Sequence, residues 1–413
     1  MAFAPLQEKL KQQSEGLFEF LAGSFTSRWE SGIGAAHHLK SHFRNLRDLR
    51  LVALAKAPTP LHHLNWLGSN AFIKRDDLLH DTYGGNKIRK FEFAFADMIR
   101  LGLRKVITLG GSGSNQGTAL AILGADFGFE VELITFPQPS TPVSMKNAEL
   151  INKYAAKIHA FDSADAAFLH LACGPHIFSP STYLLMPGAT TPLTTLGYVN
   201  AVFEMCEQID EGLMPTPGAI VVAAGTQGTA VGLSIGCLLC KLACKIVAFV
   251  ILSPEKELGI TTKQYEDNGS DLMRQTLNLL QQFDFAELPE IEWRYDFFGS
   301  SYGQPTEAGE SAQNLCSMNQ ITLDPTYTSK AFAGFQEVCR SMSPRPVLFW
   351  NTYSSTHYNW QTTQDSKSQY VSETHALGPK PPWGAPLRAH HWLGAQRKKI
   401  GKYRVQNAIL IDF

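Results

Sequence analysis

The chain has 413 residues, a formal net charge of −1 at pH 7, 44% hydrophobic residues and 18% charged residues. This composition is typical of a soluble globular protein, excludes a disordered or fibrous chain, and at this length predicts two domains. A near-neutral charge also excludes a dedicated binder of nucleic acid or of an anionic membrane, because such proteins need a basic face.

No apolar targeting segment opens the chain, since its first residues include Glu8, Lys9 and Lys11. The longest uncharged run, Gly212–Cys240, is interrupted by the polar turn Gly225–Thr229. A membrane-spanning helix would not carry such a turn, so we predict a strand, a loop and a helix there. We therefore expect a cytoplasmic protein with no membrane and no nucleic-acid partner.

The seven cysteines are an odd number and are spread along the chain, which predicts reduced thiols rather than a disulfide framework. Cys237, Cys240 and Cys244 have a spacing that resembles a metal site. They lie in a stretch of small apolar residues, and no second ligand cluster accompanies them. We predict that they pack in the core and that the protein has no metal site.

Residues 1–57 are mixed in pattern, with Leu6–Leu21 as the best helix candidate. A regular alternation follows. The predicted strands of the first half are Phe72–Lys74, Lys105–Leu109, Glu130–Phe136 and Lys157–Phe161. The predicted helices between them are Lys87–Leu101, Asn115–Phe127 and Ser144–Tyr154.

The same rhythm returns in the second half. Strands are predicted at Ala219–Ala224, Lys245–Leu252, Ile291–Phe298 and Val347–Trp350, and helices at Thr229–Leu242 and Ser270–Gln282. Alternating strands and helices with short connections predict an α/β fold with mostly parallel, doubly wound sheets. The last 50 residues break this pattern and hold eight Lys or Arg against three Asp or Glu, which indicates a basic appendage.

Two glycine-rich turns, Gly110–Gln116 and Gly225–Thr229, each follow a predicted strand and open a predicted helix. Free N–H groups at a helix N-terminus favour an anion. Neither turn is a G-x-G-x-x-G fingerprint or a P-loop, which disfavours a nicotinamide cofactor. A single phosphate monoester remains open, as does a purely structural role at a tight junction.

A third glycine motif, Gly299–Gly303, matches G-x-S-x-G and follows a strand-like segment. This pattern is typical of a nucleophile elbow, which makes a serine hydrolase using Ser301 an alternative function. Gln304 and Pro305 follow the motif, however, and no strong apolar helix begins there. Short patterns of this kind also arise by chance in long chains.

The segment Ile73–Leu78, followed by Gly84–Lys90, carries the string K-R-D-D and then G-G-N-K-I-R-K. It resembles the cofactor-lysine region of the pyridoxal-phosphate family that contains 1-aminocyclopropane-1-carboxylate deaminase and D-cysteine desulfhydrase. Lys87 falls on the position of the lysine that forms the imine. An aldehyde cofactor needs such an amine, which then also serves as a base.

Further segments match the family in the same order along the chain, and the resemblance covers about residues 59–355. They are Gly110–Asn115, Pro187–Ala189 with Leu196–Val199, Gly225–Thr229, Gly299–Pro305 and Asp324–Thr328. The resemblance implies that Lys87 carries pyridoxal 5'-phosphate and moves the proton, that Asn115 bonds the ring oxygen, and that Ser114 contacts substrate or assists Lys87. As plain structure, Ser114 and Asn115 would cap their helix.

The remaining implied cofactor contacts are the phosphate turn and two threonines near the ring nitrogen. They are Gly225, Thr226, Gln227, Gly228 and Thr229, together with Thr328 and Thr352. Tyr302 and Tyr327 would line the substrate face, although core packing is the commoner fate of a tyrosine. Gln116, Gln227 and Tyr353-Ser354 depart from the family pattern, which predicts an altered substrate side.

Thr328 stands where ring-opening deaminases of the family carry Glu, and Thr352 is the second informative site. A hydroxyl holds a ring proton less strongly than a carboxylate does, which makes the ring a weaker electron sink. We therefore predict β-elimination from D-cysteine, to pyruvate, sulfide and ammonia. The alternatives are 1-aminocyclopropane-1-carboxylate deamination and a non-catalytic relative that only binds the cofactor.

The resemblance also implies a fold-type II architecture, in which two α/β domains enclose the cofactor in the cleft between them. Carried onto this chain, residues 90–198 would form the smaller domain, and residues 58–89 with 199–362 the larger one. Residues 1–57 would be an N-terminal extension and 363–413 the basic C-terminal appendage. The family further implies a homodimer and a small amino acid as substrate.

Overall fold

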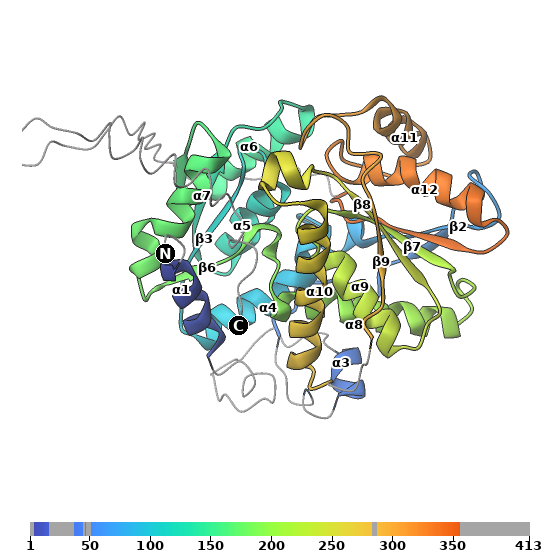
Figure 1. The fold of residues 1–413 in the computed structure, drawn as a ribbon, viewed down its shortest axis with the longest axis horizontal. Coiled ribbons are helices and arrows are strands. Elements are labelled where there is room, and N and C mark those ends of the chain that lie inside the picture. Colours follow the sequence, from blue (N-terminus) through green and yellow to red (C-terminus); the bar gives the residue numbers. More distant parts are fainter. Residues whose placement is uncertain (1–3, 16–36, 44–45, 47–50, 283–286, 356–413) are drawn as a thin grey trace, which may run out of the picture.

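Residues 4–15, 37–43, 46, 51–282 and 287–355 are described by the computed structural model of the chain. They form two sheets with helices on their faces, the α/β architecture that the sequence predicts (Figure 1). The predicted appendage 363–413 lies outside the described residues. So do residues 16–36, which include the second part of the predicted helix Leu6–Leu21.

The smaller sheet has four parallel strands in the order β5-β4-β3-β6. Its strands are β3 (Lys105–Gly111), β4 (Glu130–Phe136), β5 (Lys157–Ala160) and β6 (Thr182–Leu184), and its helices α5 (Asn115–Asp126), α6 (Pro142–Tyr154) and α7 (Ala164–Cys173). The predicted strands at β3, β4 and β5 are confirmed. The strand β6 has three residues, and the sequence analysis missed it.

Both faces of this sheet are covered, because its strands alternate between two apolar clusters. Val106 and Leu133 pack in the cluster of α4 (Lys87–Arg100), α5 and α6, whereas Ile107 and Ile134 pack with α7 and α1 (Ala4–Ser14). The N-terminal helix α1 is tied to the sheet by polar contacts as well. Gln13 donates to the carbonyl of Leu184 at 3.1 Å and accepts from its N–H at 2.8 Å. This part of the N-terminal extension therefore belongs to the covering layer of the smaller sheet.

The larger sheet has six strands in the order β1-β2-β10-β7-β8-β9. They are β1 (Leu61–His63), β2 (Ala71–Lys74), β7 (Ala219–Ala224), β8 (Lys245–Val250), β9 (Ile291–Arg294) and β10 (Val347–Trp350). Only β1 runs antiparallel, at one edge. The predicted strand Ile291–Phe298 is shorter in the structure, where β9 ends four residues earlier, at Arg294.

The inner strands of the larger sheet are apolar on both faces, as buried parallel strands are. One face packs on α11 (Glu307–Met318) and α12 (Thr328–Met342), and the other on α8 (Pro192–Asp210) and α9 (Gly228–Leu239), as Figure 1 shows. Beside α9 lies α10 (Thr262–Leu279), predicted to start at Ser270. It starts earlier because Thr261 and Gln264 form a capping box.

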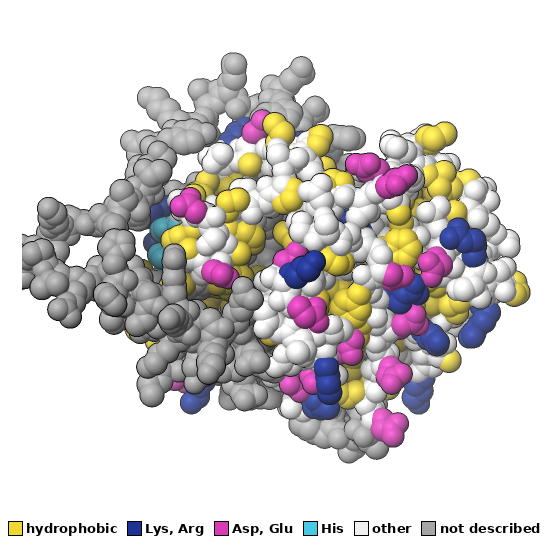
Figure 2. All heavy atoms as spheres, turned by 45° about the horizontal axis from the view of Figure 1, so that its top comes forward, with side chains coloured by type: hydrophobic (Ala, Val, Ile, Leu, Met, Phe, Trp, Pro, Cys, Tyr) yellow, Lys and Arg dark blue, Asp and Glu magenta, His cyan; other side chains and the backbone are white. Residues whose placement is uncertain are grey.

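The cysteine cluster predicted in the core lies at the end of α9. Cys237 is buried, and Cys240 and Cys244 are partly buried against the same apolar cluster. Within the described ranges, no group of three or more His, Cys, Asp or Glu side chains could hold a metal ion. None of the helices described is long and apolar enough to cross a membrane. On the face in Figure 2, the acidic and basic side chains of described residues are interspersed.

A buried network of four charges joins helix α4 (Lys87–Arg100) to the end of β2 and to helix α8. The Arg89 guanidinium contacts Asp76 Oδ1 at 2.8 Å and Glu204 Oε2 at 2.9 Å, and Lys74 Nζ contacts Glu204 Oε1 at 2.5 Å. All four side chains are at most 2% exposed. The two cations nearby hold the pKa of Glu204 well below its usual range despite burial. Two positive and two negative charges are thus balanced without solvent.

We predict that Arg89→Met destabilises the protein by about 3–5 kcal/mol, because it leaves two buried carboxylates short of their cation. The midpoint of urea unfolding, followed by circular dichroism, measures the effect. Lys263→Met is the matched control, since the Lys263–Asp267 pair is exposed and such pairs contribute about 0–1 kcal/mol. Equal losses in the two variants would contradict this role of the network.

Candidate active site

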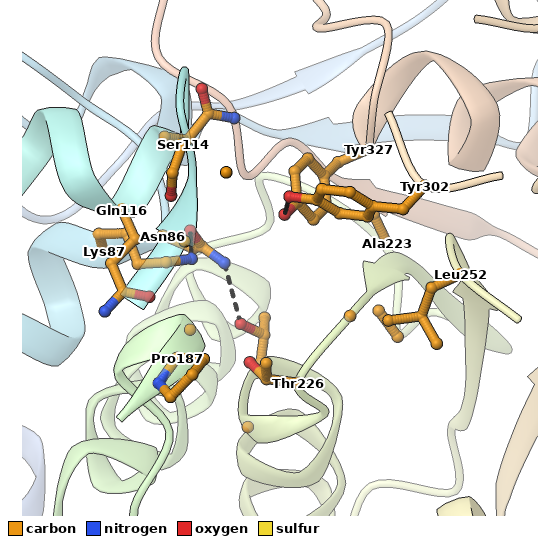
Figure 3. Close-up of a pocket in the computed structure, with 18 of the residues that line it drawn as sticks. Asn86, Lys87, Ser114, Gln116, Pro187, Ala223, Thr226, Leu252, Tyr302 and Tyr327 are labelled. Atoms are coloured by element: carbon orange, nitrogen blue, oxygen red, sulfur yellow. Dashed lines mark hydrogen bonds between the residues drawn. The ribbon is translucent and has the colours of Figure 1, made fainter. Parts of the chain in front are cut away.

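A cavity of about 410 Å³ lies where the carboxyl ends of strands from both sheets meet. Its walls include the end of β3 at Leu109–Gly111 and the end of β7 at Ala223–Ala224. Loops from 83–87, 187–188, 225–230 and 352–354 complete it. Open α/β sheets bind their ligands at such strand ends, so this cavity is the candidate active site (Figure 3).

Lys87 is the first residue of α4 and lines the cavity. Its Nζ donates to Asn86 Oδ1 at 2.8 Å, and Asn86 Nδ2 donates to Thr229 Oγ1 at 3.2 Å, the contact dashed in Figure 3. Burial lowers the pKa of the Lys87 amine to about 8, while the carboxylate of Asp324 opposes this shift. A large neutral fraction near pH 8 suits an amine that attacks a carbonyl.

The backbone before Lys87 requires its two glycines. A Cβ on Gly84 would lie 2.3 Å from the carbonyl oxygen of Asp77, and Gly85 has a φ of +90°. The turn is held from outside by the Ser354 hydroxyl, which accepts from the Gly84 N–H at 2.8 Å. Ser354, a departure from the family pattern in the sequence, therefore fixes the turn that presents Lys87.

Ser114 and Asn115 lie at the start of α5. The Ser114 hydroxyl caps the helix by accepting from the Gly117 N–H at 3.2 Å, and Ser114 and Asn115 both line the cavity. Asn115 Oδ1 accepts from Asn147 Nδ2 at 2.7 Å and from the Tyr83 hydroxyl at 3.3 Å. The capping contact of Ser114 is therefore compatible with its position in the cavity wall.

The turn Gly225–Thr229 joins β7 to α9 and lines the cavity over its whole length. Gln227 has a left-handed φ of +66°, and its side-chain amide donates to the carbonyl of Tyr265 on α10. The Tyr265 hydroxyl in turn donates to the carbonyl of Gly225 at 2.8 Å. This anchoring from behind leaves the hydroxyls of Thr226 and Thr229 at the cavity, where a phosphate group would need them.

Lys90, one turn after Lys87 on the same face of α4, is a residue that our sequence reasoning missed. Its Nζ donates to the carbonyl of Gly188 at 2.9 Å and to Thr190 Oγ1 at 3.1 Å, and it lines the cavity. A Cβ on Gly228 would lie 2.9 Å from this nitrogen, which places Lys90 against the phosphate turn. The signal for it in the sequence was its position three residues after Lys87, which puts both side chains on the same face of a helix.

The amine of Lys90 forms no salt bridge with a carboxylate in the described part of the chain. Burial, and next the nearby Lys87, lower its pKa well below the usual range. A buried amine next to the turn Gly225–Thr229, with its hydroxyls of Thr226 and Thr229, fits a dianionic phosphate. The phosphate would favour the charged form of the Lys90 amine. The residues present therefore fit a phosphate group at this end of the cavity.

Tyr302 and Tyr327 meet at the opposite wall, as Figure 3 shows. Their hydroxyl oxygens are 2.6 Å apart, and their rings meet edge to face. Burial raises the pKa of Tyr302 to about 12 and that of Tyr327 well above its usual range. Both hydroxyls are therefore protonated at neutral pH; one donates to the other, and the second keeps its proton to donate to a ligand.

The two predicted ring-nitrogen residues differ in position. Thr352 lines the cavity, and its hydroxyl has no hydrogen-bond partner in the described part of the chain. Thr328 is not among the lining residues, and its hydroxyl donates to Asp324 Oδ1 at 2.8 Å. Asp324 itself does line the cavity, where its carboxylate accepts from three backbone N–H groups at the start of α12.

Ser301 is exposed, does not line the cavity and is followed by a turn, with α11 starting only at Glu307. The structure therefore does not place this serine as a nucleophile elbow would. Gln116 lines the cavity, but its amide donates to Thr108 Oγ1 at 2.8 Å and to the carbonyl of Met186 at 3.1 Å. Its nitrogen is thus engaged in holding the 186–190 loop.

Comparisons with known proteins identify the family of this chain. Residues 52–352 match the family described as "pyridoxal-phosphate dependent enzyme". A crystal structure of an "ACC deaminase homologue" is similar over 73% of this chain and 91% of that one, with a TM-score of 0.63 and 27% identity. A mutant of O-ureido-L-serine synthase, bound to O-ureido-L-serine, matches over 73% of this chain and 88% of its own, with a TM-score of 0.52. At 14% identity, the second likeness shows the fold alone.

The chain belongs to the pyridoxal-phosphate-dependent enzyme family, because the match spans most of its length. Its cofactor is accordingly pyridoxal 5'-phosphate, and its fold is the fold-type II arrangement of two mostly parallel sheets. The suspected relationship to 1-aminocyclopropane-1-carboxylate deaminase and D-cysteine desulfhydrase is confirmed at the level of the family.

We predict that Lys90→Met weakens retention of the cofactor about 10- to 100-fold, because a charge-assisted hydrogen bond contributes about 1.5–3 kcal/mol. Dialysis followed by measurement of bound cofactor gives the dissociation constant. Lys330→Met is the matched control, since Lys330 is also buried and donates to the carbonyl of Phe298 but does not line the cavity. Similar losses in both variants would assign Lys90 a purely structural role.

Proposed function

We propose that the protein is a lyase that uses pyridoxal phosphate to eliminate the β-substituent of a small amino acid, with D-cysteine as the leading substrate. The observation that carries the proposal is the buried amine of Lys87, whose pKa is lowered to about 8, inside the cavity that also holds the phosphate turn. The overall conversion is D-cysteine and water to pyruvate, hydrogen sulfide and ammonia.

In this proposal the chain's own residues bind and move protons. Lys87 Nζ takes the proton from the substrate α-carbon, and the sulfur departs as thiolate while the neutral Tyr302–Tyr327 pair donates a hydrogen bond to it; solvent then protonates the released thiolate. Ser114, which lines the cavity at the N-terminus of α5, binds the substrate carboxylate in this proposal. The bound cofactor supplies an electron-withdrawing ring that stabilises negative charge at the α-carbon.

The choice of D-cysteine rests on the ring nitrogen. In our proposal it faces the hydroxyl of Thr352, which has no partner among the described residues, and Asp324, a carboxylate that lines the cavity, already accepts from N–H and hydroxyl donors at the start of α12. A neutral partner stabilises the protonated ring nitrogen only weakly. The resulting weaker electron sink is still sufficient to expel a good leaving group such as thiolate. Deamination of 1-aminocyclopropane-1-carboxylate is the alternative, supported by the likeness to the "ACC deaminase homologue".

The lowered pKa of Lys87 predicts how attachment of the cofactor depends on pH. Only the neutral amine attacks the aldehyde, and below a pKa of about 8 its fraction falls tenfold per pH unit. Mixing cofactor-free protein with pyridoxal phosphate should therefore give a rate that rises up to about pH 8 and then levels. Growth of the visible absorption band measures this rate. A rate that still rises through pH 10 would contradict the proposal, because an ordinary exposed lysine behaves in that way.

The substrate is tested by offering D-cysteine and 1-aminocyclopropane-1-carboxylate to the holoenzyme, with L-cysteine and D-serine as controls. We expect sulfide release from D-cysteine to exceed 2-oxobutanoate release from the cyclopropane compound. Lys87→Ala should reduce every such rate by at least 10²–10⁴-fold, because the base and the point of attachment are both lost. Faster 2-oxobutanoate release would favour the alternative. Cofactor binding without any product would indicate a relative that only binds the cofactor.

A further inference from the structure

We propose that Asn147 sets the polarity of the Asn115 side chain, so that Asn115 turns its NH₂ group, and not its carbonyl oxygen, into the cavity. Asn147 lies on α6, is 4% exposed and does not line the cavity. It would therefore be a positioning residue that acts through Asn115. The inference rests on the proposed function, because it takes the cofactor's ring oxygen as the acceptor.

The orientation follows from one contact whose direction is fixed. Asn147 Nδ2 lies 3.0 Å from the carbonyl oxygen of Gly113 and 2.7 Å from Asn115 Oδ1. A backbone carbonyl only accepts hydrogen bonds, so the Asn147 atom that faces Gly113 must be its nitrogen. Because the same nitrogen faces Asn115, the Asn115 atom at 2.7 Å must be the oxygen. The usual ambiguity between the two ends of an amide is thereby removed.

Tyr83 supports the same orientation. Its hydroxyl lies 3.3 Å from Asn115 Oδ1 and 3.4 Å from Asn147 Oδ1, so its single proton is shared between two acceptors. Burial raises the pKa of Tyr83 well above its usual range, which keeps that proton in place. Asn115 Nδ2 is then left without a partner in the described part of the chain, on a residue that lines the cavity.

An NH₂ group donated to the ring oxygen has a defined effect on the cofactor. That oxygen, when ionised, attracts the proton of the imine formed with Lys87. A second donor draws electron density from the oxygen and weakens this attraction, which lowers the pKa of the imine nitrogen. A carbonyl oxygen in the same place would do the reverse. The polarity of Asn115 therefore tunes the protonation state of the resting holoenzyme.

The test is a pH titration of the visible absorption band of the holoenzyme. Asn147→Asp keeps the size of the side chain but only accepts hydrogen bonds, so it favours the reversed Asn115 amide; its added negative charge acts in the same direction, which Asn147→Leu separates because it adds no charge. We expect the midpoint to rise by about one pH unit or more, which corresponds to about 1.4 kcal/mol per unit. Asn147→Leu and Tyr83→Phe remove donors to Asn115 Oδ1 without reversing it and should give smaller rises. Other titratable groups that line the cavity, including Lys87, Lys90, Asp324, Tyr302 and Tyr327, are common to all these proteins.

Asn200→Asp is the matched control, because Asn200 is a buried asparagine on α8 outside the cavity lining. Its midpoint should equal that of the wild type. An unchanged midpoint in Asn147→Asp would overturn the positioning role, and Tyr83→Phe decides in the same way if the Asn147 variants do not fold. A wild-type protein that forms no visible band would instead overturn the attachment of the cofactor to Lys87, which is a separate failure.

Discussion

The buried charges of Asp76, Arg89 and Glu204 are the constraint on which the arrangement of the site depends. Arg89 is two residues after Lys87, and its guanidinium joins the segment after β2 to helix α8. The Trp350 indole, at the end of β10, donates to Asp76 Oδ2 at 2.7 Å as well. The segment after β2, the end of β10 and helix α8 are therefore held against the first turn of α4. Because isolated buried charges are so costly, α4 has few alternative positions.

The chemistry at the start of α4 follows from this rigidity. Burial makes the Lys87 amine less basic although the Asp324 carboxylate opposes the shift, and burial together with the charge of Lys87 makes the Lys90 amine less basic. Both effects require that Lys87 and Lys90 stay in the low-dielectric interior. If the helix were free to tilt, the two side chains would reach solvent and regain ordinary basicity. The charges of Asp76, Arg89 and Glu204, which stabilise the fold, are thus separate from the amines of Lys87 and Lys90, which line the cavity.

Most of the fold could be predicted from the sequence, because buried parallel strands are short apolar runs and their helices carry clear periodicity. The strands β4, β7 and β10 begin and end where the pattern predicts. The strands β1 and β6, the helices α7, α11 and α12, and the early start of α10 were missed. Strands of three residues carry no period, and a capping box is a local polar signal. In the site, Lys87 and the glycine turns were visible as motifs. Lys90, Asn147 and Tyr83 were not, because their roles depend on contacts between distant segments.

Gly188 is in direct contact with the phosphate turn, since a Cβ on it would lie 1.7 Å from Thr226 Oγ1. The cradle is therefore built from a loop that precedes α8 and a turn that follows β7, and neither half is complete without the other. A partly folded chain lacks the cradle, so the cofactor binds the native state selectively. Such a ligand raises the free energy of unfolding by RT ln(1 + [L]/Kd), about 2.7 kcal/mol at 100 times Kd. Vitamin B6 supply would accordingly influence how long this protein survives in the cell, apart from how fast it works.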